Sequence, residues 1–113
     1  MTDFKEKYKA FKSSARFYLN NKSLYSSQME TQKNSNSTYL KYLQEDISFV
    51  ENTLSQVREK CGSAACLIVY MIFVEGRKQN EIAEEYHMTR RQLQYSVTKW
   101  MKKVFEGDSL ESD

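Results

Sequence analysis

Apolar residues recur at helical spacing near the start of the chain. In residues 3–20 they fall three or four positions apart and form one stripe: Phe4, Tyr8, Phe11, Ala15 and Tyr18. Basic side chains lie off that stripe at Lys5, Lys9, Lys12 and Arg16. This pattern predicts one helix over residues 3–20. Beyond Asn20 the pattern weakens, so we expect only a further short turn or helix around residues 24–29, then a polar loop over residues 31–38.

The most regular pattern covers residues 38–59. Leu40, Leu43, Ile47, Val50, Leu54 and Val57 alternate at spacings of three and four, which is the heptad pattern of packed helices. Tyr39, Tyr42 and Phe49 are expected to widen this stripe. Two interpretations stay open: the stripe packs against neighbouring helices of the same chain, or it forms the seam of a dimer.

Residues 63–76 are apolar on all sides, which is typical of a helix at the centre of a fold. Ser63 is expected to cap its start and Gly76 its end. The chain has no proline and only three glycines, which favours helices. We therefore predict an all-α single domain of four or five helices. Its expected parts are an N-terminal helical arm and loop (1–36), a helical core (37–106) and an acidic, disordered tail (107–113).

The net charge of +2 conceals an uneven distribution. Residues 1–22 and 77–105 each carry +4, residues 23–76 carry −2, and residues 106–113 carry −4. The first basic segment either contacts nucleic acid or simply faces water. The acidic end either keeps the protein in solution or competes with nucleic acid for the second basic segment.

The second basic segment contains two predicted helices joined by a bend. The first spans residues 78–86 and turns Ile82, Ala83 and Tyr86 inward. His87 and Met88 make the bend, with Met88 turned into the core. Thr89 begins the second helix and Gln92 follows three residues later, the spacing of a capping box. These two helices span residues 78–105.

The second of these helices has two unlike faces. Leu93, Val97, Trp100, Met101 and Val104 fall on one side, and Arg91, Tyr95, Thr98 and Lys102 on the other. Residues 86–105 hold five Lys or Arg and no acid. Arginine and glutamine can read guanine and adenine edges, and lysine neutralises phosphates. The candidate DNA-binding residues are Thr89, Arg90, Arg91, Gln94, Tyr95, Thr98, Lys99, Lys102 and Lys103. The alternative is a solvated basic face on a core helix.

The stretch EIAEEYHMTRRQLQYSVTKWMKKVF resembles the helix-turn-helix of region four in bacterial sigma factors. The helix layout is also similar to phage late-gene transcription regulators of the RinA and ArpU type. Two departures stand out: Lys78 replaces the Ser or Thr that caps the first helix, and His87 replaces the glycine of the bend. Histidine is among the residues that tolerate the positive φ needed there.

This resemblance implies a sequence-specific DNA-binding transcription regulator, of the phage or prophage late-gene activator type. The implied partners are double-stranded DNA, RNA polymerase, and a second copy in a homodimer on a split site. The alternative function is a helical protein-interaction module that binds RNA polymerase or a host protein. Exposed apolar residues on the 38–59 seam would favour that alternative.

Other chemistries find little support in the sequence. We see no paired nucleophile and base and no phosphate-binding glycine loop, so we expect no enzyme and no cofactor. One histidine and two cysteines cannot make a four-ligand zinc site, so we expect no metal. Cys61 and Cys66 are expected to be buried, reduced thiols. The start of the chain is too polar for a signal peptide and the longest apolar run is too short for a membrane span, so a cytoplasmic protein is expected.

Overall fold

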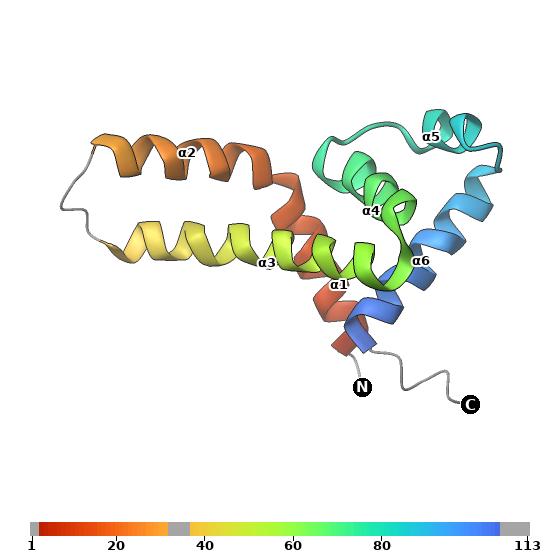
Figure 1. Cartoon of the computed structure of the whole chain (residues 1–113), viewed down its shortest axis with the longest axis horizontal. Helices are drawn as coiled ribbons and strands as arrows, with labels where there is room; N and C mark the ends of the chain where they lie inside the picture. Colours follow the sequence, from red (N-terminus) through yellow and green to blue (C-terminus); the bar gives the residue numbers. More distant parts are fainter. Residues whose placement is uncertain (1–2, 32–36, 107–113) are drawn as a thin grey trace.

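The computed structural model describes residues 3–31 and 37–106, and within these ranges the fold is all-α, as predicted, with six α-helices rather than the four or five expected. The elements are α1 (Asp3–Arg16), α2 (Tyr18–Thr31), α3 (Ser37–Cys61), α4 (Ser63–Val69), a π-helical turn η1 (Tyr70–Val74), α5 (Gln79–Glu85) and α6 (Arg90–Glu106). Figure 1 shows α2 lying beside the first half of α3 and projecting away from α4, α5 and α6. We call α2 together with residues 37–51 the α2–α3 hairpin. The tail over residues 107–113 lies outside the described residues.

The helix predicted over residues 3–20 is wrong in its bounds, because the chain bends at Phe17 and begins a second helix (Figure 1). The carboxylate of Asp46 on α3 explains where the bend falls. It accepts hydrogen bonds from Ser14 Oγ of α1 at 2.8 Å and from Asn21 Nδ2 of α2 at 3.2 Å. One acid therefore holds both helices, and the predicted short turn around residues 24–29 is part of a 14-residue helix.

The expected loop over residues 31–38 is shorter in the structure, because α2 ends at residue 31 and α3 begins at residue 37. Residues 32–36 lie outside the described residues. No helix in the described ranges is both long and apolar enough to cross a membrane.

The heptad seam of α3 packs inside its own chain. Leu40, Leu43, Ile47, Val50 and Val57 are buried, and Leu54 is half-buried against the core. These residues therefore pack against helices of the same chain and do not form the seam of a dimer, since a buried seam cannot contact a partner. Tyr39 and Tyr42 do not widen the stripe as predicted: they are 53% and 69% exposed, because the narrow two-helix hairpin covers only one side of α3.

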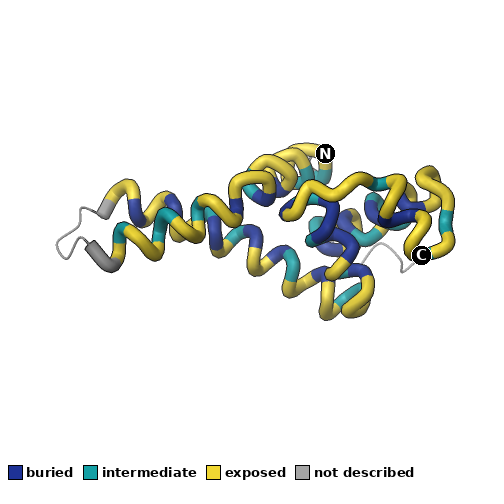
Figure 2. The backbone as a smooth tube through the Cα atoms, turned by 90° about the horizontal axis from the view of Figure 1, so that it is seen from above, coloured by how far each residue is buried: buried dark blue, intermediate teal, exposed yellow. Residues whose placement is uncertain are grey.

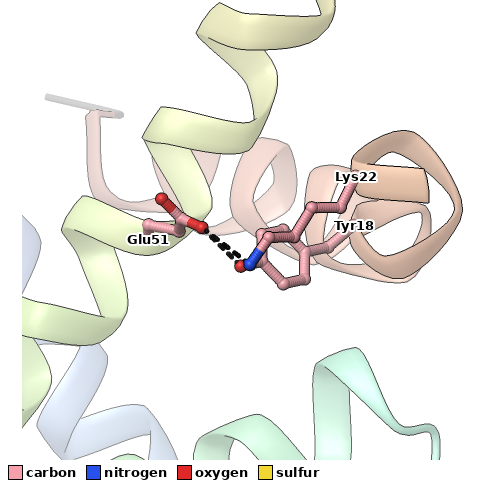
Figure 3. A network of polar contacts seen from close by, with 3 residues as sticks. All are labelled: Tyr18, Lys22 and Glu51. Carbon is pink, nitrogen blue, oxygen red and sulfur yellow. Dashed lines mark hydrogen bonds and ion pairs between the residues drawn. The ribbon is translucent and has the colours of Figure 1, made fainter. Parts of the chain in front are cut away.

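A three-residue contact ties the start of α2 to the middle of α3. Tyr18 Oη donates a hydrogen bond to Glu51 Oε2 at 2.6 Å, and Lys22 Nζ lies 3.5 Å from the same oxygen (Figure 3). Burial raises the pKa of Tyr18, and its hydrogen bond to Glu51 acts in the same direction. This contact fixes the base of the hairpin on the body of the molecule.

Phe11 is the centre of the core. It has no exposed surface, and its ring centre lies 6.4 Å from Phe49, 5.8 Å from Phe73 and 6.5 Å from Phe105. These rings belong to α3, η1 and α6, so one aromatic cluster joins four elements. Figure 2 shows the buried residues concentrated in this body, with the outer sides of the hairpin exposed.

The apolar stretch 63–76 differs from the predicted single helix in two ways. Gly62, with φ 105°, precedes α4 as its N-cap, so Ser63 does not cap the helix. The helix changes to a π turn at Tyr70, where Glu75 N–H bonds the Tyr70 carbonyl five residues back at 3.0 Å. The stretch is buried on most sides, as expected for a central helix, and Leu67 is its exposed large apolar residue, at 50%. Gly76, with φ 68°, follows the end of the helix as predicted.

Candidate nucleic-acid interface

The bend between α5 and α6 is a hydrogen-bonded helix terminus. His87 N–H bonds the Glu84 carbonyl at 3.1 Å, and Met88 N–H bonds the Ala83 carbonyl at 2.9 Å. This is the Schellman pattern, which requires a left-handed residue at His87. His87 has φ 58°, so the predicted left-handed conformation is confirmed. Met88 is half-buried against the core, which fixes where α6 begins.

The predicted capping box is confirmed at the start of α6. Thr89 N–H donates to Gln92 Oε1 at 2.9 Å, and Gln92 N–H donates to Thr89 Oγ1 at 3.0 Å. Such a reciprocal cap is worth about 1 kcal/mol to a helix. At the start of α5, Lys78 is the N-cap and makes no side-chain hydrogen bond, as its replacement of Ser or Thr implied. The first turn of α6 is therefore better fixed than that of α5.

The apolar face of α6 packs as predicted. Leu93, Val97, Met101 and Val104 are buried, and Trp100 is half-buried against the same core. The opposite side carries an outward row of four exposed residues, which we call the α6 ridge: Arg91, Tyr95, Lys99 and Lys102. Tyr95 is 70% exposed, so its ring is available to a partner.

The candidate DNA-binding residues outside the α6 ridge lie on several different sides of α6. Gln94 lies on the side towards α5, where its Nε2 donates to Gln79 Oε1 at 3.0 Å. Thr98 is half-buried, although the sequence placed it on the outward face. Thr89 belongs to the cap, and Arg90 and Lys103 are exposed at the two ends of α6.

The α6 ridge is not neutralised by acids of the described chain. The ion pairs found in residues 3–31 and 37–106 are Lys22–Glu51 and Arg77–Glu85, each 3.5 Å, and neither involves α6. Lys102 Nζ instead lies 5.7 Å from the ring centre of Phe4 on α1, a cation–π contact that leaves its charge uncompensated. The ridge therefore presents positive charge to solvent along its length.

A shallow hollow lies beside the bend, at the foot of the α6 ridge. It is lined by His87, Met88, Arg91, Gln92, Tyr95 and Ser96. Four of these lining residues were not among the predicted site residues: His87, Met88, Gln92 and Ser96. The spacing of four between Gln92 and Ser96, next to Arg91 and Tyr95, is the sequence signal that could have identified them.

The described residues contain no group of three His, Cys, Asp or Glu that could hold a metal ion. Cys61 and Cys66 form no disulfide, and both are half-buried rather than buried as expected. Cys66 Sγ donates to the Leu54 carbonyl at 3.4 Å, and burial raises the pKa of its thiol. The thiol of Cys66 thus serves the packing between α3 and α4.

Comparison of the chain with protein-family models, with curated proteins and with solved structures gave no match. The resemblance to sigma factor region four and to phage regulators therefore stays a prediction that depends on the residues of α5, the bend and α6.

We expect His87→Gly to leave the free energy of unfolding unchanged or to raise it by up to about 1 kcal/mol. Glycine removes a left-handed cost of about 1–2 kcal/mol but adds freedom to the unfolded chain worth about 0.4–1 kcal/mol. Gly76→Ala is the matched control, because it adds a Cβ at a position with positive φ, whereas His87→Gly removes one. At Gly76 a Cβ meets nothing within 4 Å, so only its φ of 68° opposes the substitution.

Thermal and urea unfolding of both variants measure these effects. Gly76→Ala is expected to lose about 1 kcal/mol while His87→Gly loses nothing. A clear drop in melting temperature for His87→Gly would show that the imidazole supports the bend.

Proposed function

We propose that this protein is a sequence-specific DNA-binding transcription regulator, with α5, the bend and α6 acting as a helix-turn-helix. The single observation that carries the proposal is the α6 ridge, a row of exposed cationic and aromatic side chains on a helix whose other face is anchored in the core. An α-helix fits the major groove, so such a ridge can reach base edges there.

In this proposal, residues at the start of α6 contact bases and residues further along contact phosphates. Arg91 lies in the first turn of the ridge, where its guanidinium can form two hydrogen bonds with guanine. Tyr95 is next along and beside the hollow, where an apolar ring and a recess suit a thymine methyl group. Lys99, Lys102 and Lys103 lie further along α6 and suit the phosphate backbone.

Three further candidates have supporting roles in this proposal. Thr89 and Arg90 are at the start of α6, where backbone N–H groups and the helix dipole favour a phosphate. Gln94 reaches a base only by exchanging its hydrogen bond to Gln79. Thr98 is half-buried and contributes little.

The type of regulator is proposed on the resemblance alone: a phage or prophage late-gene activator that acts in the cytoplasm with RNA polymerase. The rival function, a protein-interaction module, would be favoured by exposed apolar residues on the seam of α3. The six heptad residues are buried or half-buried, but Tyr39 and Tyr42 beside them are exposed, so burial on α3 does not separate the two functions.

The test is selection of bound sequences from a random DNA pool, followed by affinity measurement on the selected site and on random DNA. We expect Arg91→Ala to weaken binding to the selected site by about 1–3 kcal/mol, with little loss on random DNA. Lys102→Ala is the matched comparison, and it should weaken binding to both DNAs alike, because it contacts only phosphate.

Two results would remove the proposal. One is a failure to enrich any sequence together with affinity that does not change with salt. The other is an equal loss on selected and random DNA for both variants, which would leave charge attraction without base reading. Circular dichroism of each variant confirms that α6 is intact.

A further inference from the structure

The α2–α3 hairpin and its base expose most of the large apolar side chains found on the described surface. Seven such side chains are exposed over residues 3–31 and 37–106, and five of them belong to this part: Phe17, Leu19, Met29, Tyr39 and Tyr42. A hairpin of only two helices covers one side of each helix and leaves the other open. Exposed apolar surface gathered in one region marks an interaction site.

Three of these side chains lie on one continuous surface. Tyr42 lines one hollow with Phe17 and a neighbouring hollow with Tyr39. Because the two hollows share Tyr42, they form a single surface, which we call the Tyr42 face. Its members used below are Phe17, Gln28, Tyr39, Lys41, Tyr42 and Glu45.

Few charged side chains are described on the hairpin, and most of them already have a polar partner. Lys22 is the only charged residue between Phe17 and Met29, and it pairs with Glu51. Asp46 accepts hydrogen bonds from α1 and α2. Among the hairpin side chains that the structure describes, Lys41 and Glu45 remain, and neither forms an ion pair within residues 3–31 and 37–106. They have opposite charge, lie one helical turn apart, and border Tyr42.

We propose that the Tyr42 face binds a second copy of this chain about a two-fold axis that crosses α3 between Lys41 and Glu45. In such a contact each residue meets the partner position related by the axis. Lys41 of one copy then lies opposite Glu45 of the other, and Glu45 lies opposite Lys41. The two Tyr42 rings meet near the axis, and two hairpins together make a four-helix bundle.

The charges on the Tyr42 face favour a second copy of this chain as its binding partner. A nearly neutral, apolar surface is unsuited to nucleic acid, whose binding depends on many cations. Self-association through a two-fold axis penalises a surface with one sign of charge, and here the two remaining charges cancel across the axis. The inference does not depend on DNA binding, since the Tyr42 face and the α6 ridge share no residue.

The experiment is sedimentation equilibrium of the full chain over a wide concentration range. We expect a reversible monomer–dimer equilibrium and a dimer association constant that falls at least about tenfold in Tyr42→Lys. Lys41→Glu alone and Glu45→Lys alone should each weaken association by about tenfold, because each creates two like-charge contacts. The double variant carrying both changes should recover association to within about threefold of the parent.

Leu67→Lys is the control, because Leu67 is 50% exposed on α4, outside the hairpin, and should leave association unchanged. Circular dichroism of the dilute monomers shows whether each variant is folded. A monomer at every concentration overturns the proposal. The proposal is also overturned if Tyr42→Lys leaves the dimer association constant unchanged. The same holds if the double variant associates as weakly as the two single variants.

Discussion

Phe11→Ala is expected to lower the free energy of unfolding by about 3–5 kcal/mol. Phe11 is fully buried, and its ring contacts a ring from each of three other elements. The substitution removes the stabilisation that comes from burying one aromatic side chain. It also leaves a cavity between four elements, which cannot all move in to fill it. A domain of this size is stable by only about 5–15 kcal/mol, so this loss is a substantial fraction of the total.

Urea unfolding followed by circular dichroism measures this loss. Tyr95→Ala is the matched control, because it removes an aromatic ring from a side chain that is 70% exposed and lies outside the Tyr42 face, and we expect a cost below about 1 kcal/mol. Similar costs for the two variants would mean that α1 is not part of the core.

Replacing Lys99, Lys102 and Lys103 of α6 together by glutamine is expected to reduce the affinity for any DNA duplex by roughly a hundredfold to a thousandfold at ~0.1 M salt. Each phosphate contact contributes about 0.9 to the slope of log affinity against log salt, so the slope should flatten by about 2–3. Glutamine keeps the helix propensity of lysine, so the helix itself should persist.

A salt series with a mobility-shift or fluorescence-anisotropy assay measures both quantities. The control replaces Lys5, Lys9 and Arg16 of α1 by glutamine, which removes the same charge from exposed positions elsewhere. We expect little change in its slope, as for a basic face in water. A slope that flattens equally in both variants would mean that α1 also contacts the duplex, or that only total charge matters.

Local signals in the sequence were reliable where a few neighbouring residues decide the structure. The capping box at Thr89 and Gln92, the left-handed turn at His87 and the apolar face of α6 all formed as predicted. Each depends on hydrogen bonds or packing within about one helical turn, which the residue types determine.

The sequence predictions were wrong mainly where residues far apart in the sequence determine the local structure. The bend at Phe17 depends on Asp46 of α3, about thirty positions away, so the stripe in residues 3–20 carried no sign of it. The exposure of Tyr39 and Tyr42 depends on how many helices surround α3 there. Gly62 replaced Ser63 as the N-cap because the turn from α3 into α4 takes φ 105°, which only glycine adopts readily.

The ring cluster around Phe11 has a consequence for how the molecule assembles. Phe11 and Phe105 stand near opposite ends of the sequence, yet their rings touch, so this contact closes a loop of almost the entire polypeptide. Loop closure of that length is among the slowest contacts to form. The bend and the cap depend only on neighbouring residues, whereas the contact between Phe11 and Phe105 requires α1 and α6 to be brought together across the length of the chain.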